Sequence, residues 1–231
     1  MQRPSPLPSS TFTTASIGSS TGLVILGGLV YELGVASLPI GHWDHEFVDI
    51  SHLIVNELIW WSEVCLLLLY VTKIERRPLS SIGLKAPGLK NVGIGISLGI
   101  LMIALLGILY LRVLPSLHLE DQVAESENAA ALLATPLWWR FVSTIRAAVA
   151  EEILFRGYPM QRIEELTGSR IAATLISCTV FTAAHLSTWG SSHTLIVAVA
   201  ALTFSFAYLW RRNLWVNVIA HFMVDAISVL A

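Results

Sequence analysis

Two adjacent glutamates, Glu151 and Glu152, stand in the stretch EEILFR, inside a segment that is otherwise apolar enough to cross a membrane. Glu152 and Arg156 are four residues apart, so on an α-helix they face one another and can form an ion pair. Glu151 is rotated by about 100° from Glu152 and shares a face with Phe155 instead. The pairing leaves Glu151 free, and an unpaired carboxylate in a low-dielectric cavity suits a general base that takes a proton from water.

Two later segments carry polar residues at helical spacing. The stretch FTAAH places Phe181 and His185 four residues apart on one face. The stretch NVIAHFMVD places Asn217, His221 and Asp225 at successive intervals of four, which makes a polar stripe on a helix otherwise built from Ile, Val, Phe and Met. We expect these two faces to meet the free carboxylate.

The depth of these residues in a membrane can be compared by counting from a turn. If TGSR is the turn, with Gly168 at its centre, Glu151 precedes it by 17 residues and His185 follows it by 17. In an antiparallel helical hairpin both then lie at one height, about 25 Å from the turn. His221 follows Arg212 by nine residues, or about 13 Å of helix. The three groups therefore converge in the cytoplasmic leaflet if part of the hairpin protrudes into the cytosol.

The set Glu151, His185, His221 and Asp225 can hold one water molecule, either directly or through a divalent metal. Two histidines with a carboxylate and an open position are typical of hydrolytic zinc sites. Without a metal, Glu151 would deprotonate the water while the imidazoles or Asp225 orient it and stabilise the oxyanion. The cofactor prediction is therefore zinc or another divalent metal held by these four residues, or none. No HExxH motif or GxSxG elbow offers another hydrolytic site.

The composition indicates the setting for this chemistry. Of the 231 residues, 55% are hydrophobic and 13% are charged, and the mean hydropathy is +0.69. These values are typical of a polytopic membrane protein. The net charge is -2, and no long basic run could grip a phosphate backbone, which argues against nucleic acid as a partner. The lipid bilayer is the expected environment.

Apolar length and charge predict the fold class: an all-α, polytopic transmembrane bundle of about seven spans, with an intramembrane catalytic cavity open to the cytosol. Residues 1–21 are predicted to be a disordered cytosolic tail, and residues 22–231 a single transmembrane domain with its motif-bearing core at 137–231. Basic residues concentrate in the second, fourth and sixth connections. The N-terminus is therefore expected in the cytosol. The predicted spans are 22–40, 52–72, 91–112, 137–157, 171–189, 194–210 and 214–231.

Two further features of the spans have structural interpretations. Arg146 lies deep in the fourth span, where it could neutralise Glu57 or Glu63 of the second. The stretch GIGISLG, residues 93–99, has no strand before it, so we interpret its small residues as a helix-packing face and not as a phosphate loop.

The motifs resemble those of a known family. EEILFR at 151–156, FTAAH at 181–185 and HFMVD at 221–225 are similar, in order and membrane context, to the EExxxR, FxxxH and HxxxN/D motifs of the CAAX prenyl protease and bacteriocin-processing (Abi) intramembrane proteases. RRPLSSIGLKAP, residues 76–87, resembles a weaker hallmark of bacterial members. Each motif is weak alone, but three in order on predicted spans are specific.

The resemblance implies an intramembrane endopeptidase of the bacterial plasma membrane, acting on a peptide or membrane-associated protein. It assigns the water-activating base to Glu151, support to Glu152 and Arg156, and water or metal binding to His185, His221 and Asp225. Asp225 stands where eukaryotic-type members have Asn, so the metal question stays open. Type II members cleave prenylated CAAX sequences, whereas bacterial relatives are associated with bacteriocin self-immunity and peptide maturation. The alternatives are a non-catalytic immunity or scaffold protein and a bis-histidine haem or proton-conducting protein.

Overall fold

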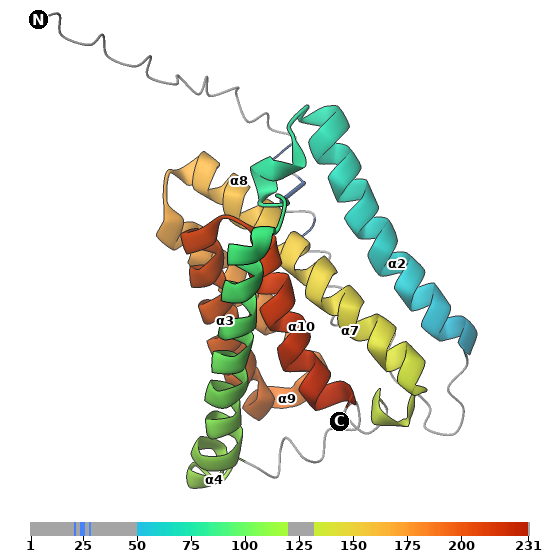
Figure 1. The fold of residues 1–231 in the computed structure, drawn as a ribbon, viewed down its shortest axis with the longest axis vertical. Helices are drawn as coiled ribbons and strands as arrows, with labels where there is room; N and C mark the ends of the chain where they lie inside the picture. The colour runs from blue at the N-terminus through green and yellow to red at the C-terminus, as the bar shows by residue number, and fades with distance from the viewer. Residues whose placement is uncertain (1–20, 22–23, 26–27, 29–49, 120–131, 231) are drawn as a thin grey trace, which may run out of the picture.

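The structure is a computed structural model that describes residues 21, 24, 25, 28, 50–119 and 132–230 (Figure 1). The predicted cytosolic tail, apart from residue 21, and most of the predicted first span, 22–40, lie outside the described residues. The side chains of residues 50, 52, 187–191 and 228 lie outside them as well.

Every regular element among the described residues is helical. The α-helices are α2 (Ile50–Leu69), α3 (Gly88–Ile108), α4 (Leu114–Ser116), α7 (Leu137–Glu151), α8 (Tyr158–Thr167), α9 (Arg170–Arg211) and α10 (Leu214–Leu230). π-Helical turns extend three of them, η2 (Tyr70–Ile74), η4 (Leu109–Val113) and η5 (Glu152–Gly157), and a 3-10 turn, η3 (Leu79–Ile82), lies between α2 and α3. The predicted all-α class is confirmed.

Membrane character is concentrated in a few of these helices. In the described part of the chain, Leu53–Ile74, Gly88–Ser116 and Ser192–Arg211 are long and apolar enough to cross a bilayer, while Arg170–Leu186 and Leu214–Ile227 are apolar but shorter. Leu58 and Leu66 of α2, and Ile100 and Leu101 of α3, are exposed. Such apolar surfaces are typical of helices surrounded by lipid, and the chain is an integral membrane protein.

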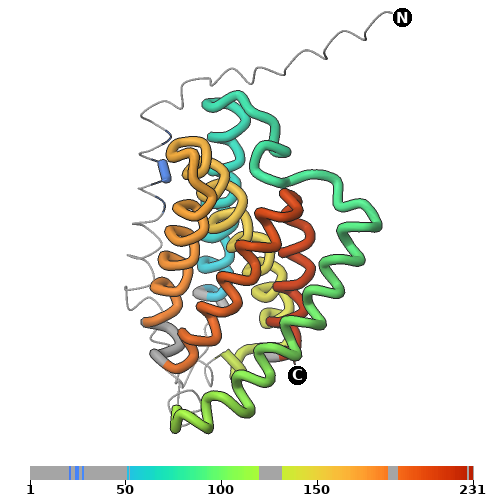
Figure 2. The backbone as a smooth tube through the Cα atoms, turned by 90° about the vertical axis from the view of Figure 1, so that its left-hand side faces the viewer, coloured from blue at the N-terminus to red at the C-terminus, as the bar shows by residue number. Residues whose placement is uncertain are grey.

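Helix α9 reverses direction along its length, which joins the predicted fifth and sixth spans. A straight helix would place Cys178 and Ser205, which are 27 residues apart, about 40 Å from one another. Their Sγ and Oγ atoms are instead 3.3 Å apart. The two arms of α9, Arg170–Leu186 and Ser192–Arg211, therefore pack against one another as antiparallel helices (Figure 2).

Helix α10 lies between α3 and α7 and brings its polar stripe to the centre of the molecule. The glycine face of α3 permits this packing, as the sequence predicted. A methyl group on Gly95 would lie 3.0 Å from the backbone oxygen of Val216, and one on Gly99 would lie 2.7 Å from Met223 Sδ. The small residues thus allow close contact between two helices.

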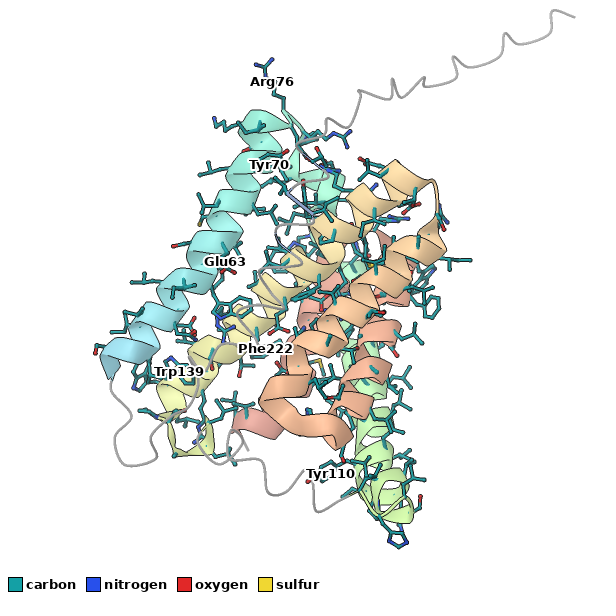
Figure 3. The ribbon with its side chains drawn as sticks, turned by 180° about the vertical axis from the view of Figure 1, so that it is seen from behind. Glu63, Tyr70, Arg76, Tyr110, Trp139 and Phe222 are labelled. Atoms are coloured by element: carbon teal, nitrogen blue, oxygen red, sulfur yellow. The ribbon has the colours of Figure 1, made fainter. Side chains whose placement is uncertain are left out.

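The basic connections meet at one end of the bundle, where they are held by acidic residues. Buried Arg162 of α8 donates to Glu75 Oε2 over 2.6 Å and to Glu165 over 3.3 Å. Arg212 pairs with Glu164. Although partial burial acts in the opposite direction, hydrogen bonds from Arg212 and Arg170 hold the pKa of Glu164 below its usual value. Figure 3 shows Arg76 projecting from this end, while Tyr110 lies at the other.

The stretch RRPLSSIGLKAP forms the turn that joins this end to the core. Gly83 has a φ of 85°, and its carbonyl accepts from the backbone N–H of Leu214, which starts α10, over 2.9 Å. A Cβ at this position would lie 2.7 Å from Tyr208 Cε2. The turn requires glycine for both its backbone conformation and its close contact.

Gly83→Ala should lower the thermal stability of the detergent-purified protein by about 1–3 kcal/mol, because alanine is strained at this φ and its methyl group collides with Tyr208. Gly107→Ala is the matched control, since nothing lies within 4 Å of that position. Equal melting temperatures for the two variants would contradict this account of the turn.

Candidate active site

The EEILFR stretch adopts a π-helix and not the α-helix that the sequence predicted. Helix α7 ends at Glu151, and η5 covers Glu152–Gly157. Two backbone carbonyls of η5 are bound by side chains from the two arms of α9. Ser177 Oγ donates to the carbonyl of Phe155 over 2.8 Å, and Tyr208 Oη donates to that of Gly157 over 3.3 Å. π-Helical turns are frequent at functional sites, where they redirect side chains.

The Glu152 carboxylate is completely buried and accepts from three residues. Arg156 Nη1 lies 3.1 Å from Oε1, as the four-residue spacing predicted. Asn217 Nδ2 donates to Oε2 over 2.9 Å, and His221 Nδ1 lies 3.0 Å from Oε1. With both oxygens engaged, Glu152 is a structural anion and is not placed to act as a base.

The two histidines each bind an acceptor through Nδ1. His185 Nδ1 is 2.8 Å from the carbonyl of Phe181, and His221 Nδ1 faces the Glu152 carboxylate. Carbonyls and carboxylates only accept, so both Nδ1 atoms carry the hydrogen. Both Nε2 atoms are directed elsewhere, toward Glu151.

Glu151 Oε2 lies 4.0 Å from His185 Nε2 and 3.9 Å from His221 Nε2. Each separation is too long for a direct hydrogen bond. Asp225 Oδ2 is 3.4 Å from His221 Nε2. The structure therefore brings together all four predicted catalytic residues, Glu151, His185, His221 and Asp225, with each of them within 4.0 Å of another. Glu151 is largely buried, with a side-chain exposure of 13%.

The predicted supporting residues surround these four side chains. Phe181 presents its ring to His185, with centroids 4.4 Å apart, and to the guanidinium of Arg156, 3.9 Å from the ring centroid. Asn217 also donates to the carbonyl of Phe204 over 2.8 Å. Each supporting side chain thus contacts a predicted catalytic residue or the Glu152 anion.

Histidine nitrogens and carboxylates are the donor types that zinc prefers. Across the ranges that the structure describes, however, no three His, Cys, Asp or Glu side chains are arranged to hold a metal ion. As they stand, the described site side chains do not fit a metal. The zinc or other divalent metal stays a prediction.

Two other arginines of the predicted spans each have a partner. Arg146 Nε lies 3.0 Å from Glu57 Oε1, which confirms one of the two pairings considered from the sequence. Arg140 Nη1 donates to the carbonyl of Val229, in the last turn of α10, over 2.9 Å. A cation at the C-terminal end of a helix is favourable for the helix dipole.

Residues 133–227 match the family described as "Type II CAAX prenyl endopeptidase Rce1-like". The matched segment contains all eight predicted site residues and the elements that hold them. This part of the chain is therefore similar to the type II CAAX prenyl endopeptidases.

One curated protein is also similar to part of the chain. The Bacillus subtilis (strain 168) protein named "Putative membrane peptidase YdiL" is 34% identical over 110 residues, which make up 46% of this chain and 43% of that protein. The chain is thus aligned with less than half the length of this relative. No solved structure matches.

Several contacts at the site were not predicted from the sequence. Ser177 and Tyr208 bind the carbonyls of η5, and Phe204 stacks on His221 with ring centroids 5.3 Å apart. Ser177 lies four residues before Phe181 on the same helical face, which is the only local indication for any of them. The others depend on which helices pack together.

Arg156→Leu should reduce the stability of the purified protein by about 3–5 kcal/mol, because it leaves a buried carboxylate without its cation. Adding Glu152→Gln should recover part of that loss, giving a coupling of about 0.5–3 kcal/mol in a double-mutant cycle of thermal unfolding. Additive effects would show that Glu152 and Arg156 do not depend on one another.

Proposed function

We propose that the protein is an intramembrane endopeptidase in which Glu151 activates a water molecule for attack on a peptide bond. The observation that carries this proposal is the asymmetry of the two glutamates. Glu152 is bound by three donors, whereas Glu151 Oε2 lies 4.0 and 3.9 Å from the Nε2 atoms of the two histidines, beyond direct hydrogen-bond distance. The family match at residues 133–227 and the name of the Bacillus relative support the reaction class.

In the proposed first step, a water bound between Glu151 and His185 loses a proton to the Glu151 carboxylate. His185 Nε2, whose lone pair is left free by the hydrogen on Nδ1, accepts the water's other hydrogen and orients its oxygen. The water oxygen adds to the carbonyl carbon of the peptide bond, and the carbonyl oxygen becomes an oxyanion.

His221 is assigned to the oxyanion. A carboxylate oxygen lies beside each of its ring nitrogens, Glu152 at Nδ1 and Asp225 at Nε2. Protons on both nitrogens are stabilised there, and the Nε2–H is the nearby donor for developing negative charge. In the second step the C–N bond breaks, and the proton held by Glu151 passes to the leaving amine, which restores the carboxylate.

The proposed substrate is a peptide or membrane-associated protein cleaved near the cytoplasmic surface of a bacterial plasma membrane. The basic end of the bundle, with Arg77, Arg162 and Arg212 in its ion pairs, supports a cytoplasmic position for that end and for the opening of the site.

Glu151→Gln should lower the rate of peptide cleavage by about 10²–10⁴-fold, because the amide cannot take a proton from water. The measurement is mass spectrometry of a membrane-peptide library incubated with the detergent-purified wild type and variant. The control is Glu165→Gln. Glu165 is an exposed residue of α8 at the basic end of the bundle, and this variant should cleave at the wild-type rate.

Metal content is measured on the same samples. If the wild type binds zinc and His221→Ala loses both the zinc and the activity, the mechanism of glutamate-activated water is wrong and a metal-bound water takes its place. Full activity of Glu151→Gln would sink the proposed mechanism. An inactive, folded wild type against a broad library would favour the non-catalytic immunity or scaffold protein instead.

A further inference from the structure

Two phenylalanines occupy equivalent places on the two arms of α9. Phe181 lies on the first arm and Phe204 on the second, and both are buried. The ring of Phe181 packs on His185 at 4.4 Å between centroids with 37° between the planes. The ring of Phe204 stacks on His221 at 5.3 Å with 26° between the planes. Each site histidine thus has one aromatic ring against its face.

The backbone carbonyls of Phe181 and Phe204 also accept hydrogen bonds from groups at the site. The Phe181 carbonyl accepts from His185 Nδ1 over 2.8 Å. The Phe204 carbonyl accepts from Asn217 Nδ2 over 2.8 Å, and the same amide donates to Glu152, the anion that holds His221. Each phenylalanine therefore orients its histidine with both its ring and its carbonyl, directly in one case and through Asn217 and Glu152 in the other.

The guanidinium of Arg156 lies near the rings of both phenylalanines. Its Cζ lies 3.9 Å from the centroid of the Phe181 ring and 5.8 Å from that of Phe204. Arg156 is completely buried, and its Nε and Nη2 atoms have no hydrogen-bond partner. A buried cation whose donors are unpaired is stabilised by the negative faces of nearby rings. The faces of the two rings thus stabilise the part of the Arg156 guanidinium that its single ion pair leaves without a partner.

We propose that Phe204 is a second aromatic positioning residue of the active site, which fixes the ring of His221 as Phe181 fixes that of His185. It lies outside the three motifs. Its effect on turnover rests on the proposed peptidase function, whereas its effect on the geometry of His221 does not.

The competing interpretation is that Phe204 only fills the core, where it packs with Met102 and Ala220. A purely structural residue is sensitive to loss of volume and insensitive to the charge distribution of its ring. A positioning residue that stacks on one polar ring and faces a cation is sensitive to both. Pentafluorophenylalanine separates the two, because it retains the shape of phenylalanine and reverses the polarity of the ring face.

The first experiment compares wild type, Phe204→Leu and protein carrying pentafluorophenylalanine at position 204. With Phe204 as a positioning residue, kcat falls by about 10–10²-fold in both variants while KM changes less than about twofold. Phe206→Leu is the matched control, since Phe206 is on the same arm, is 58% exposed, and should retain wild-type kinetics. Wild-type kcat with the fluorinated ring would overturn the proposal.

The second experiment does not depend on turnover. Nitrogen-15 NMR of the histidine side chains should show the His221 resonances shifting in Phe204→Leu while those of His185 stay in place, and Phe181→Leu should give the reverse. An inactive wild type with this reciprocal pattern would sink the peptidase proposal and uphold the positioning role. Unchanged His221 resonances in the fluorinated protein, which keeps the packing volume, would overturn the positioning role whatever the activity.

Discussion

The structure depends on one buried anion. An unpaired carboxylate inside a membrane protein is costly, and the Glu152 side chain is completely buried. It is tolerated because Arg156 on the same π-helix, and Asn217 and His221 on α10, all bind it. These contacts fix the register of α10 against η5. Since His221 and Asp225 follow Asn217 at intervals of four, fixing one member of the stripe places the others.

The rest of the fold holds that arrangement from two sides. The π-helix leaves carbonyls for Ser177 and Tyr208, which come from opposite arms of α9, so both arms are fastened to the segment that carries Glu152. At the basic end, Gly83 receives the first N–H of α10 and packs against Tyr208. The RRPLSSIGLKAP stretch therefore has a structural explanation, since it anchors the helix that carries the polar stripe.

Hydrolysis within lipid requires a protein to bring its own polar groups for water, and to keep one of them free. The two glutamates are adjacent, but only Glu152 is bound by Arg156. The Glu151 carboxylate is therefore left to face the two histidines. The same division applies to the histidines: each uses Nδ1 for the scaffold and directs Nε2 toward Glu151. Support and chemistry are thus separated atom by atom.

The sequence alone determined the all-α membrane class, the pairing of Glu152 with Arg156, and the rows of polar residues that end in His185, His221 and Asp225. These are local properties, since apolar length and four-residue spacing act within one helix. Counting from Gly168 also anticipated that Glu151 and His185 lie at one height. Only the tertiary structure decided that EEILFR is π-helical, that α9 reverses direction, which nitrogen of each histidine faces Glu151, and that Phe204 lies against His221. Each of these depends on contacts between segments far apart in the chain, and no periodicity within one helix specifies its neighbour.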